Sequence, residues 1–190
     1  TVAAVAAELR MPVSHGELSG PKVVCAEADQ SPDGVIDFGD LTRSWAIGEL
    51  AVTVSSVLRH AGGEPVAALP LIAAFDAQRP LRDAEITALW PLVVLRAATL
   101  VVSGNQQAAV DTGNEYATGA LEFEWRIFEH AVSVPPDVMT GLIAATLGLV
   151  FLNGYFVAAE FAAVGARVSR LEALAKTSLL ARLALEIKHK

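Results

Sequence analysis

A long apolar stretch near the C-terminus constrains this chain more than any other feature. From Met139 to Val164 nearly every residue is apolar, and only Asn153 and Glu160 are strongly polar. A helix of about twenty such residues can cross the hydrocarbon core of a bilayer. A core helix of a soluble protein is the alternative. The length of the stretch and the basic segment 167–170 after it favour a single membrane span whose C-terminal end is cytoplasmic.

Charge is distributed unevenly along the chain. The formal net charge is −7, and hydrophobic residues make up 53% of the 190 residues, which is high for a soluble domain. From Glu160 onward six cations face three carboxylates, so this end carries +3 and the remainder −10. Two segments with different surroundings explain this asymmetry, and the acidic first part argues against nucleic-acid binding. We expect a membrane location, or a cytoplasmic one if the apolar helix is not inserted.

The single cysteine and the two chain ends also limit the interpretation. Cys25 is the one cysteine, so the chain cannot form an internal disulfide, which fits a reducing compartment. Its apolar neighbours predict a small, buried strand residue. The start at Thr1 has no signal-peptide pattern, and Lys190 follows no helix stop signal, so we interpret both ends as cuts.

Hydrophobic periodicity predicts a mostly helical first part with one β-hairpin. The turn signal Ser31-Pro32-Asp33-Gly34 separates two short strand candidates, 23–27 and 35–38. Apolar residues then recur at helical spacing, and Pro91 should kink or end one of these helices. The expected helices cover residues 2–9, 45–61, 65–75, 81–102 and 114–129.

Two acidic loop segments carry the chemistry of the first part. One is His15-Gly16-Glu17, and the other is Asp37-Phe38-Gly39-Asp40 at a predicted strand end. One carboxylate can bind a metal ion over the hairpin, while another on a neighbouring loop accepts a proton from a substrate hydroxyl. Phosphoryl transfer needs this division of roles between carboxylates, because one group orients the nucleophile and others hold Mg²⁺ against the phosphates. We interpret His15 as a structural loop residue.

The run His15-Gly16-Glu17-Leu18-Ser19-Gly20-Pro21-Lys22, followed by Gly34-Val35-Ile36-Asp37-Phe38-Gly39-Asp40, resembles the aminoglycoside phosphotransferase superfamily. The family loop is His-Gly-Asp, four residues and Asn, and its second motif is Ile-Asp-x-Gly. The helical region from Trp45 to about His130 is similar to the helical lobe of its hydroxylysine-kinase-like branch. The resemblance implies an α+β, mostly helical fold of the protein-kinase-like C-lobe type, with Mg²⁺ and ATP as cofactors.

Three positions decide what this resemblance implies for catalysis. Glu17 stands at the catalytic Asp position, where its extra methylene moves the carboxylate by about one ångström and can cost on the order of a hundredfold in rate. Lys22 stands at the metal-binding Asn position, and an ammonium group repels Mg²⁺. Asp37 alone matches at a metal position. Since no nucleotide-binding N-lobe precedes these motifs, we expect no kinase turnover; survival of Glu17 and Asp37 as plain loop residues is the alternative.

The apolar stretch carries a second resemblance. The run Leu152-Asn153-Gly154-Tyr155-Phe156-Val157-Ala158-Ala159-Glu160-Phe161-Ala162, with the basic segment 167–172 after it, resembles the opening of the CNNM/CorC transmembrane domain. Members of this family are implicated in magnesium and cobalt efflux. Residues 181–189 are similar to its next stretch and predict a basic amphipathic helix.

Asn153 and Glu160 are a candidate intramembrane polar site. They lie seven residues apart and therefore share one helix face. Ionisable groups within a span are costly and point to function. Such a face can meet other transmembrane helices or line an ion path. Alternatively, Glu160 lies at the cytoplasmic interface and pairs with Arg167.

The sequence thus predicts two pieces joined at Pro135-Pro136. Residues 1–134 form a phosphotransferase-like C-lobe fragment, 135–138 a linker, and 139–190 the start of a CNNM-type transmembrane domain. The expected function is that of an inactive phosphotransferase fragment. The alternatives are a membrane-embedded portion of a divalent-cation transporter and a fused chain without a joint function. Expected partners are lipid or other spans through 139–164, and an N-lobe or a second copy on the exposed face of the first piece.

Overall fold

The computed structural model describes residues 1–29, 31–111, 115–165, 178, 179 and 182. It has two compact units, Thr1–Thr146 and Leu147–Lys190. The chain is mostly helical, as the sequence predicts, and its described residues include two short antiparallel strand pairs, where the sequence predicts one hairpin. The basic segment 167–170 and most of the predicted amphipathic helix 181–189 lie outside the described residues.

The first 45 residues form short elements around two strand pairs. Strand β1 pairs with β4, and β2 pairs with β3, both antiparallel. The N-terminal helix predicted over 2–9 is split into one α-helical and one 3₁₀ turn. In chain order the elements are α1 (Val2–Val5), η1 (Ala6–Glu8), β1 (Val13–Ser14), η2 (Gly20–Lys22), β2 (Val23–Cys25), β3 (Pro32–Val35), η3 (Phe38–Asp40) and β4 (Thr42–Arg43).

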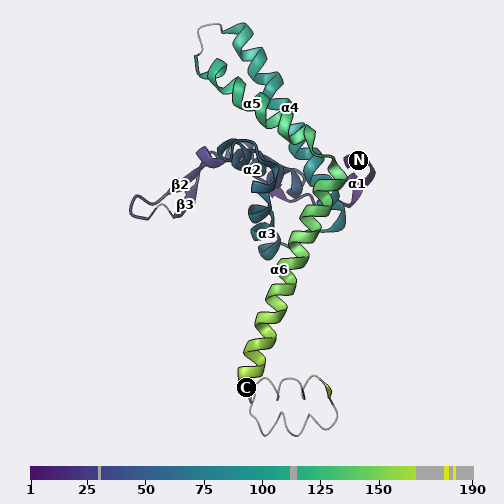
Figure 1. The fold of residues 1–190 in the computed structure, drawn as a ribbon. Helices are drawn as coiled ribbons and strands as arrows, with labels where there is room; N and C mark the ends of the chain where they lie inside the picture. The colour runs from purple at the N-terminus through teal and green to yellow at the C-terminus, as the bar shows by residue number, and fades with distance from the viewer. Residues whose placement is uncertain (30, 112–114, 166–177, 180–181, 183–190) are drawn as a thin grey trace. The chain divides into compact units, whose positions relative to one another are not determined.

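The predicted β2–β3 hairpin is present, but the position of its turn was predicted wrongly. Val23 pairs with Val35, and Cys25 pairs with Pro32, so the predicted turn residues 32–34 belong to the second strand. The chain reverses before them, where the Asp29 carboxylate accepts hydrogen bonds from the backbone N–H and hydroxyl of Ser31 at 3.0 and 2.7 Å. An Asx-type turn of this kind can reverse the chain as well as a Pro-Asp-Gly turn can. Figure 1 shows the hairpin extending away from the helices.

Cys25 lies in β2 as expected but is exposed, so its predicted burial is wrong. A two-stranded hairpin has no second layer to cover it. Val24 on the same strand is exposed for the same reason.

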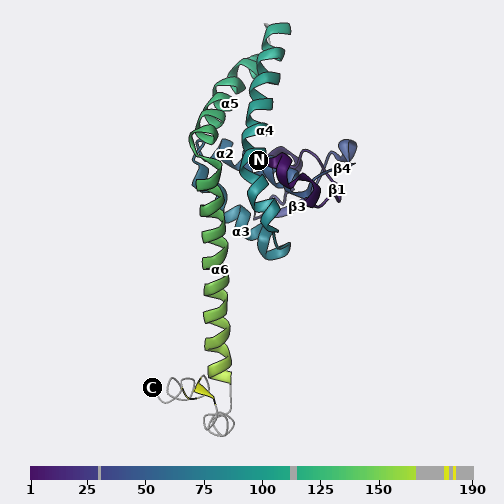
Figure 2. The same ribbon diagram turned by 90° about the vertical axis from the view of Figure 1, so that its right-hand side faces the viewer.

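Helices α2, α4 and α5 form the core of the first unit. The apolar stripe predicted from Ile47 to Leu58 is buried except at Val57, which is partly exposed. Trp90 of α4 is fully buried, and its indole N–H donates to the Ala131 carbonyl at 3.1 Å. Figures 1 and 2 show α4 and α5 running side by side. The helical elements of this unit are α2 (Ala46–His60), η4 (Pro65–Ala68), α3 (Leu69–Gln78), α4 (Asp83–Val110) and α5 (Glu115–Ser133).

Pro91 does not end its helix, since α4 continues from Asp83 to Val110. A proline inside a helix removes one hydrogen bond and costs about 3 kcal/mol. The neighbouring Trp90, Leu92 and Val93 are all buried. Burying such side chains contributes about 1.5–3 kcal/mol each, which offsets the cost of the proline.

An ion pair inside the first unit joins the N-terminal segment to α4. The Arg10 guanidinium donates through Nε to Glu85 Oε1 at 2.7 Å and pairs through Nη2 with Oε2. The same carboxylate accepts from the Arg82 backbone N–H at 3.0 Å and so caps α4. Glu85 has no exposed surface. Burial raises its pKa, but the hydrogen bonds from Arg10 and Arg82 outweigh burial, and the pKa lies below its ordinary value.

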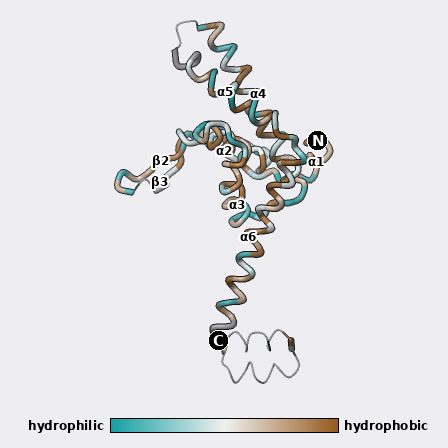
Figure 3. Tube along the Cα trace, in the orientation of Figure 1, coloured by the Kyte–Doolittle hydropathy of each residue, from teal (hydrophilic) through white to brown (hydrophobic). Residues whose placement is uncertain are grey.

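Helix α6 (Pro136–Gly165) contains the apolar stretch. In the first unit, its residues Met139 and Ile143 are fully buried. In the second unit, every residue from Gly148 to Ala162 is exposed. Figure 3 shows long apolar stretches along this helix.

Two described helices, not one, are long and apolar enough to cross a membrane: α4 and residues 136–162 of α6. They differ in burial. Of the most apolar 18 residues, 39% are buried in α4 and only 6% in α6. Packing inside the first unit accounts for α4 as a core helix, whereas α6 leaves most of its apolar surface uncovered.

We predict that Arg10→Met destabilises the first unit by about 3–5 kcal/mol, because it leaves the Glu85 carboxylate buried without a cation. The measurement is urea unfolding in mild detergent, followed by tryptophan fluorescence. The matched control is Arg126→Met, which breaks the exposed pair with Glu122 at 3.2 Å and should cost less than about 1 kcal/mol. Equal losses in the two variants would contradict this assignment.

Candidate functional site

The strand pairing brings the two acidic loops together. Residues 15–22 connect β1 to β2, and residues 36–41 connect β3 to β4. Because β1 pairs with β4 while β2 pairs with β3, the two loops lie between the same pairs of strands. The Ile36 N–H donates to the Lys22 carbonyl at 3.0 Å and joins the loops at the base of the hairpin. The motifs that the sequence singles out are therefore neighbours.

His15 is buried and bonded through both ring nitrogens. Its Nδ1 accepts from the Glu17 backbone N–H at 3.4 Å, which leaves Nε2 protonated to donate to the Ile36 carbonyl at 2.8 Å. The ring also lies 5.3 Å from that of Phe38. Both ring nitrogens form hydrogen bonds with backbone atoms, which agrees with a structural role.

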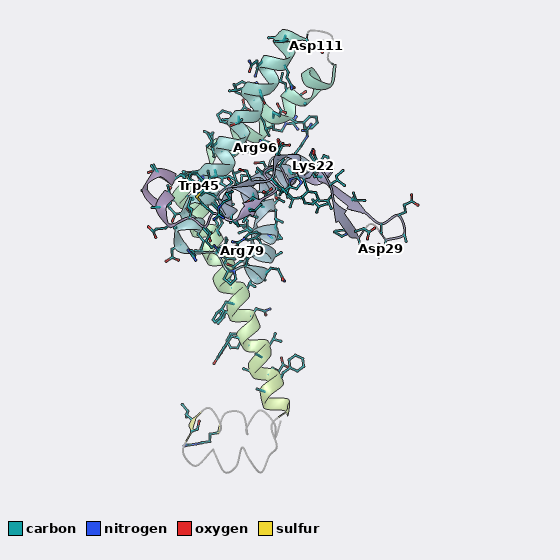
Figure 4. The ribbon with its side chains drawn as sticks, turned by 180° about the vertical axis from the view of Figure 1, so that it is seen from behind. Lys22, Asp29, Trp45, Arg79, Arg96 and Asp111 are labelled. Carbon is teal, nitrogen blue, oxygen red and sulfur yellow. The ribbon has the colours of Figure 1, made fainter. Side chains whose placement is uncertain are left out.

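The central feature of the site is an ion pair between Lys22 and Asp37. The sequence resemblance predicts metal-binding positions at these two residues, with Lys22 in place of an Asn and Asp37 as the matching Asp. The Lys22 ammonium donates to Asp37 Oδ2. Figure 4 shows Lys22 at the base of the hairpin, with Asp29 at its far end.

The electrostatics of this pair keep it charged. The hydrogen bond to Asp37 raises the pKa of Lys22, and the carboxylates of Glu17 and Asp40 raise it further. The hydrogen bond from Lys22 lowers the pKa of Asp37. Both groups are therefore ionised at neutral pH. A single ammonium group thus lies in the field of three carboxylates, where a divalent cation would otherwise be attracted.

The described residues do not fit a Mg²⁺ ion at this place. Mg²⁺ needs oxygen ligands in near-octahedral geometry, but the Asp37 carboxylate is already held by Lys22. Glu17 is exposed and its carboxylate makes no hydrogen bond within the described residues. No group of three His, Cys, Asp or Glu side chains in the described part of the chain could hold a metal.

Asp37 has an unusual backbone. Its φ of 69° makes it the one non-glycine residue with positive φ among those described. Asp tolerates this left-handed region better than most residues, but still at a cost of order 1 kcal/mol. Strained residues gather at functional sites, and this one carries the carboxylate that accepts a hydrogen bond from Lys22.

Glu49 of α2 is a site residue that the sequence did not reveal. Its carboxylate accepts from the Gly16 N–H at 2.5 Å and from the Leu18 N–H at 2.8 Å. It thereby binds the backbone on both sides of Glu17. Gly16 has φ of +88°, and an added Cβ would lie 3.4 Å from the Asp40 carbonyl oxygen, so the loop conformation favours glycine there.

Two further polar residues of α2 continue this contact. Thr53 Oγ1 donates to the Leu18 carbonyl at 3.0 Å, and Ser56 Oγ accepts from the Gly20 N–H at 3.0 Å. Together with Glu49, they follow at intervals of four and three and so share one helix face. That polar row, beside the apolar stripe, is the sequence signal that could have identified them.

The other predicted site residues lie on α6. Asn153 and Glu160 are both exposed in the second unit. Their spacing places them on one helix face. Arg167, the alternative partner of Glu160, lies outside the described residues.

No protein-family model, curated protein or solved structure matches this chain.

We predict that Glu49→Ala releases the loop. The Gly16 and Leu18 amides would each lose a hydrogen bond to a charged acceptor, worth about 1.5–3 kcal/mol. Their hydrogen exchange should accelerate by about tenfold or more, while amides in the middle of α4 keep their rates. The control is Glu64→Ala, which removes an exposed carboxylate just after α2. Unchanged exchange at Gly16 and Leu18 would rule out this role for Glu49.

Proposed function

We propose that the first part of the chain is a C-lobe fragment of a small-molecule phosphotransferase of the aminoglycoside and hydroxylysine kinase type, and that it is inactive as it stands. The observation that supports this best is the contact between the two acidic loops, His15–Lys22 and Ile36–Asp40, through His15 and the Lys22–Asp37 pair. A phosphotransferase needs its proton-accepting loop and its metal-binding loop side by side.

We attribute the inactivity to the chemistry of three side chains, Lys22, Asp37 and Glu17. Lys22 neutralises the carboxylate that would bind Mg²⁺. Without the metal, the charge of the phosphates has no counterion. Glu17 is anionic but carries one methylene more than the Asp of the resembled family, which shifts a proton acceptor away from its position.

We predict that the native chain does not bind Mg²⁺ or MgATP at millimolar concentration, and that Lys22→Asn allows Mg²⁺ to bind. The substitution removes the competing ammonium and supplies an amide oxygen, which is a suitable ligand. Isothermal titration with MgCl₂ and then with MgATP measures both. Lys22→Met is the matched control, because it removes the ammonium without adding an oxygen.

Two results would overturn the proposal. One is MgATP binding tighter than millimolar by the native chain that is lost in Asp37→Ala. The other is failure of both Lys22→Asn and the Glu17→Asp/Lys22→Asn double variant to bind Mg²⁺ better than Lys22→Met.

A second candidate function belongs to residues 139–190, as the membrane-embedded portion of a divalent-cation transport protein. The observation that favours it is the exposed apolar surface of α6, where Leu149, Phe151 and Phe161 are 66–76% exposed. Water does not favour such a surface, and lipid does. Asn153 and Glu160 would then face other spans, since ion sites are built between several helices.

We predict that the expressed chain stays in the membrane fraction after carbonate extraction. Phe151→Asp should move a large part of it to the soluble fraction, because a charge near the middle of a span costs about 2.5–3.5 kcal/mol. The control is Val110→Asp, at a residue that is 84% exposed at the end of α4. Recovery of the native chain as soluble protein would exclude the span.

The orientation can be read from Cys25, the one cysteine in the sequence and exposed in the first unit. The positive-inside rule predicts that a membrane-impermeant thiol reagent labels it in intact cells. That result would place the first part away from cytosolic ATP and would favour a fused chain without a joint function. Labelling only after lysis would contradict the predicted orientation and leave the phosphotransferase proposal standing.

A further inference from the structure

A cavity of about 390 Å³ lies beside the paired loops, in the first unit. It is bounded by helices α2, α4 and α5 and by the loop residues Ser19 and Pro21. Its volume is within the range of small-molecule sites. Val52, Leu100 and Ile127 form apolar parts of its wall.

A buried carboxylate with one unpaired oxygen lies in this wall. Glu124 of α5 is 9% exposed, and its Oε2 has no hydrogen-bond partner within the described residues. The oxygen packs so closely on α4 that a Cβ at Gly104 would lie 2.6 Å from it. Burial raises the pKa of Glu124, and the charges of Arg59 and Arg96 oppose that rise. A buried polar atom in this state is rare in folded proteins and calls for an explanation.

Two guanidinium groups line the same cavity. Arg59 is in the last turn of α2, and Arg96 is near the middle of α4. Neither forms an ion pair within the described residues. They act on Glu124 through their charge and not through a hydrogen bond. Guanidinium groups are suited to bind carboxylates with two parallel hydrogen bonds.

We infer that this cavity binds a small zwitterion, whose ammonium group pairs with Glu124 and whose carboxylate pairs with Arg59 and Arg96. The charges decide between ligand classes. A simple amine would meet two guanidiniums, a simple anion would meet the buried carboxylate, and an uncharged ligand would leave all three groups unpaired. A zwitterion with a short apolar body satisfies the charges and the apolar wall together. The site does not depend on phosphoryl transfer.

The test is isothermal titration of the full chain in detergent, without Mg²⁺ or nucleotide, with glycine, 4-aminobutyrate and 6-aminohexanoate. At least one of these should bind with a Kd below about 1 mM, a modest affinity for so few atoms. For that ligand, the analogue without the ammonium and the analogue without the carboxylate should each bind at least about tenfold more weakly, since each loses a charged pair.

Variants locate the site. Glu124→Gln and Arg96→Gln should each weaken binding about tenfold or more, while Glu122→Gln, an exposed carboxylate on the same helix, should not. Glu124→Gln removes a buried charge, so it should fold and melt at a higher temperature than the native chain when no ligand is present. The inference is overturned if no zwitterion binds, if a singly charged analogue binds equally well, or if Glu124→Gln leaves the Kd unchanged. A failed Mg²⁺ titration would leave this result unaffected.

Discussion

The first unit is organised around Arg10. Its carbonyl oxygen accepts from the Ala46 N–H at 2.9 Å at the start of α2, and its guanidinium neutralises Glu85 in the first turn of α4. A fully buried carboxylate persists only when it is paired and hydrogen-bonded, and the Arg82 N–H completes that requirement. Arg10 therefore contacts the first turn of two of the three core helices, α2 and α4, just before the chain enters β1.

Helix α2 then has two separate tasks. Its apolar stripe packs into the core, where Val54 and Leu58 are fully buried. Its polar row binds the backbone of the loop, mainly through Glu49. A loop held by side chains of a rigid helix keeps a defined conformation although its own residues pack little. The position of Glu17 thus depends on a helix that begins almost thirty residues later in the sequence.

The sequence predicted the elements better than the contacts between them. The helical spacing of α2 and the strands of the hairpin were visible, because local periodicity determines both. The turn at Asp29 was missed, since strand register is set by pairing across the hairpin and not by the strongest local turn signal. The sequence also predicted neighbouring loops for Glu17 and Asp37, and the two loops are joined through the Ile36–Lys22 and Lys22–Asp37 contacts. The role of Glu49 did not, because a polar residue on a helix gives no sign of which backbone amides it will meet.

Charged side chains gather at two places in the first unit, and the two places differ in how the charges are paired. At the paired loops, the chain supplies its own cation, and Lys22 removes the unmatched charge of Asp37. In the cavity, one carboxylate, Glu124, lies in the field of two guanidinium groups, Arg59 and Arg96, without a hydrogen bond to either. Charged groups that are not bonded to one another remain free to pair with a ligand of opposite polarity. An internal ion pair, by contrast, must be broken before any ligand can enter. The cavity is therefore prepared for a ligand in a way that the paired loops 15–22 and 36–41 are not.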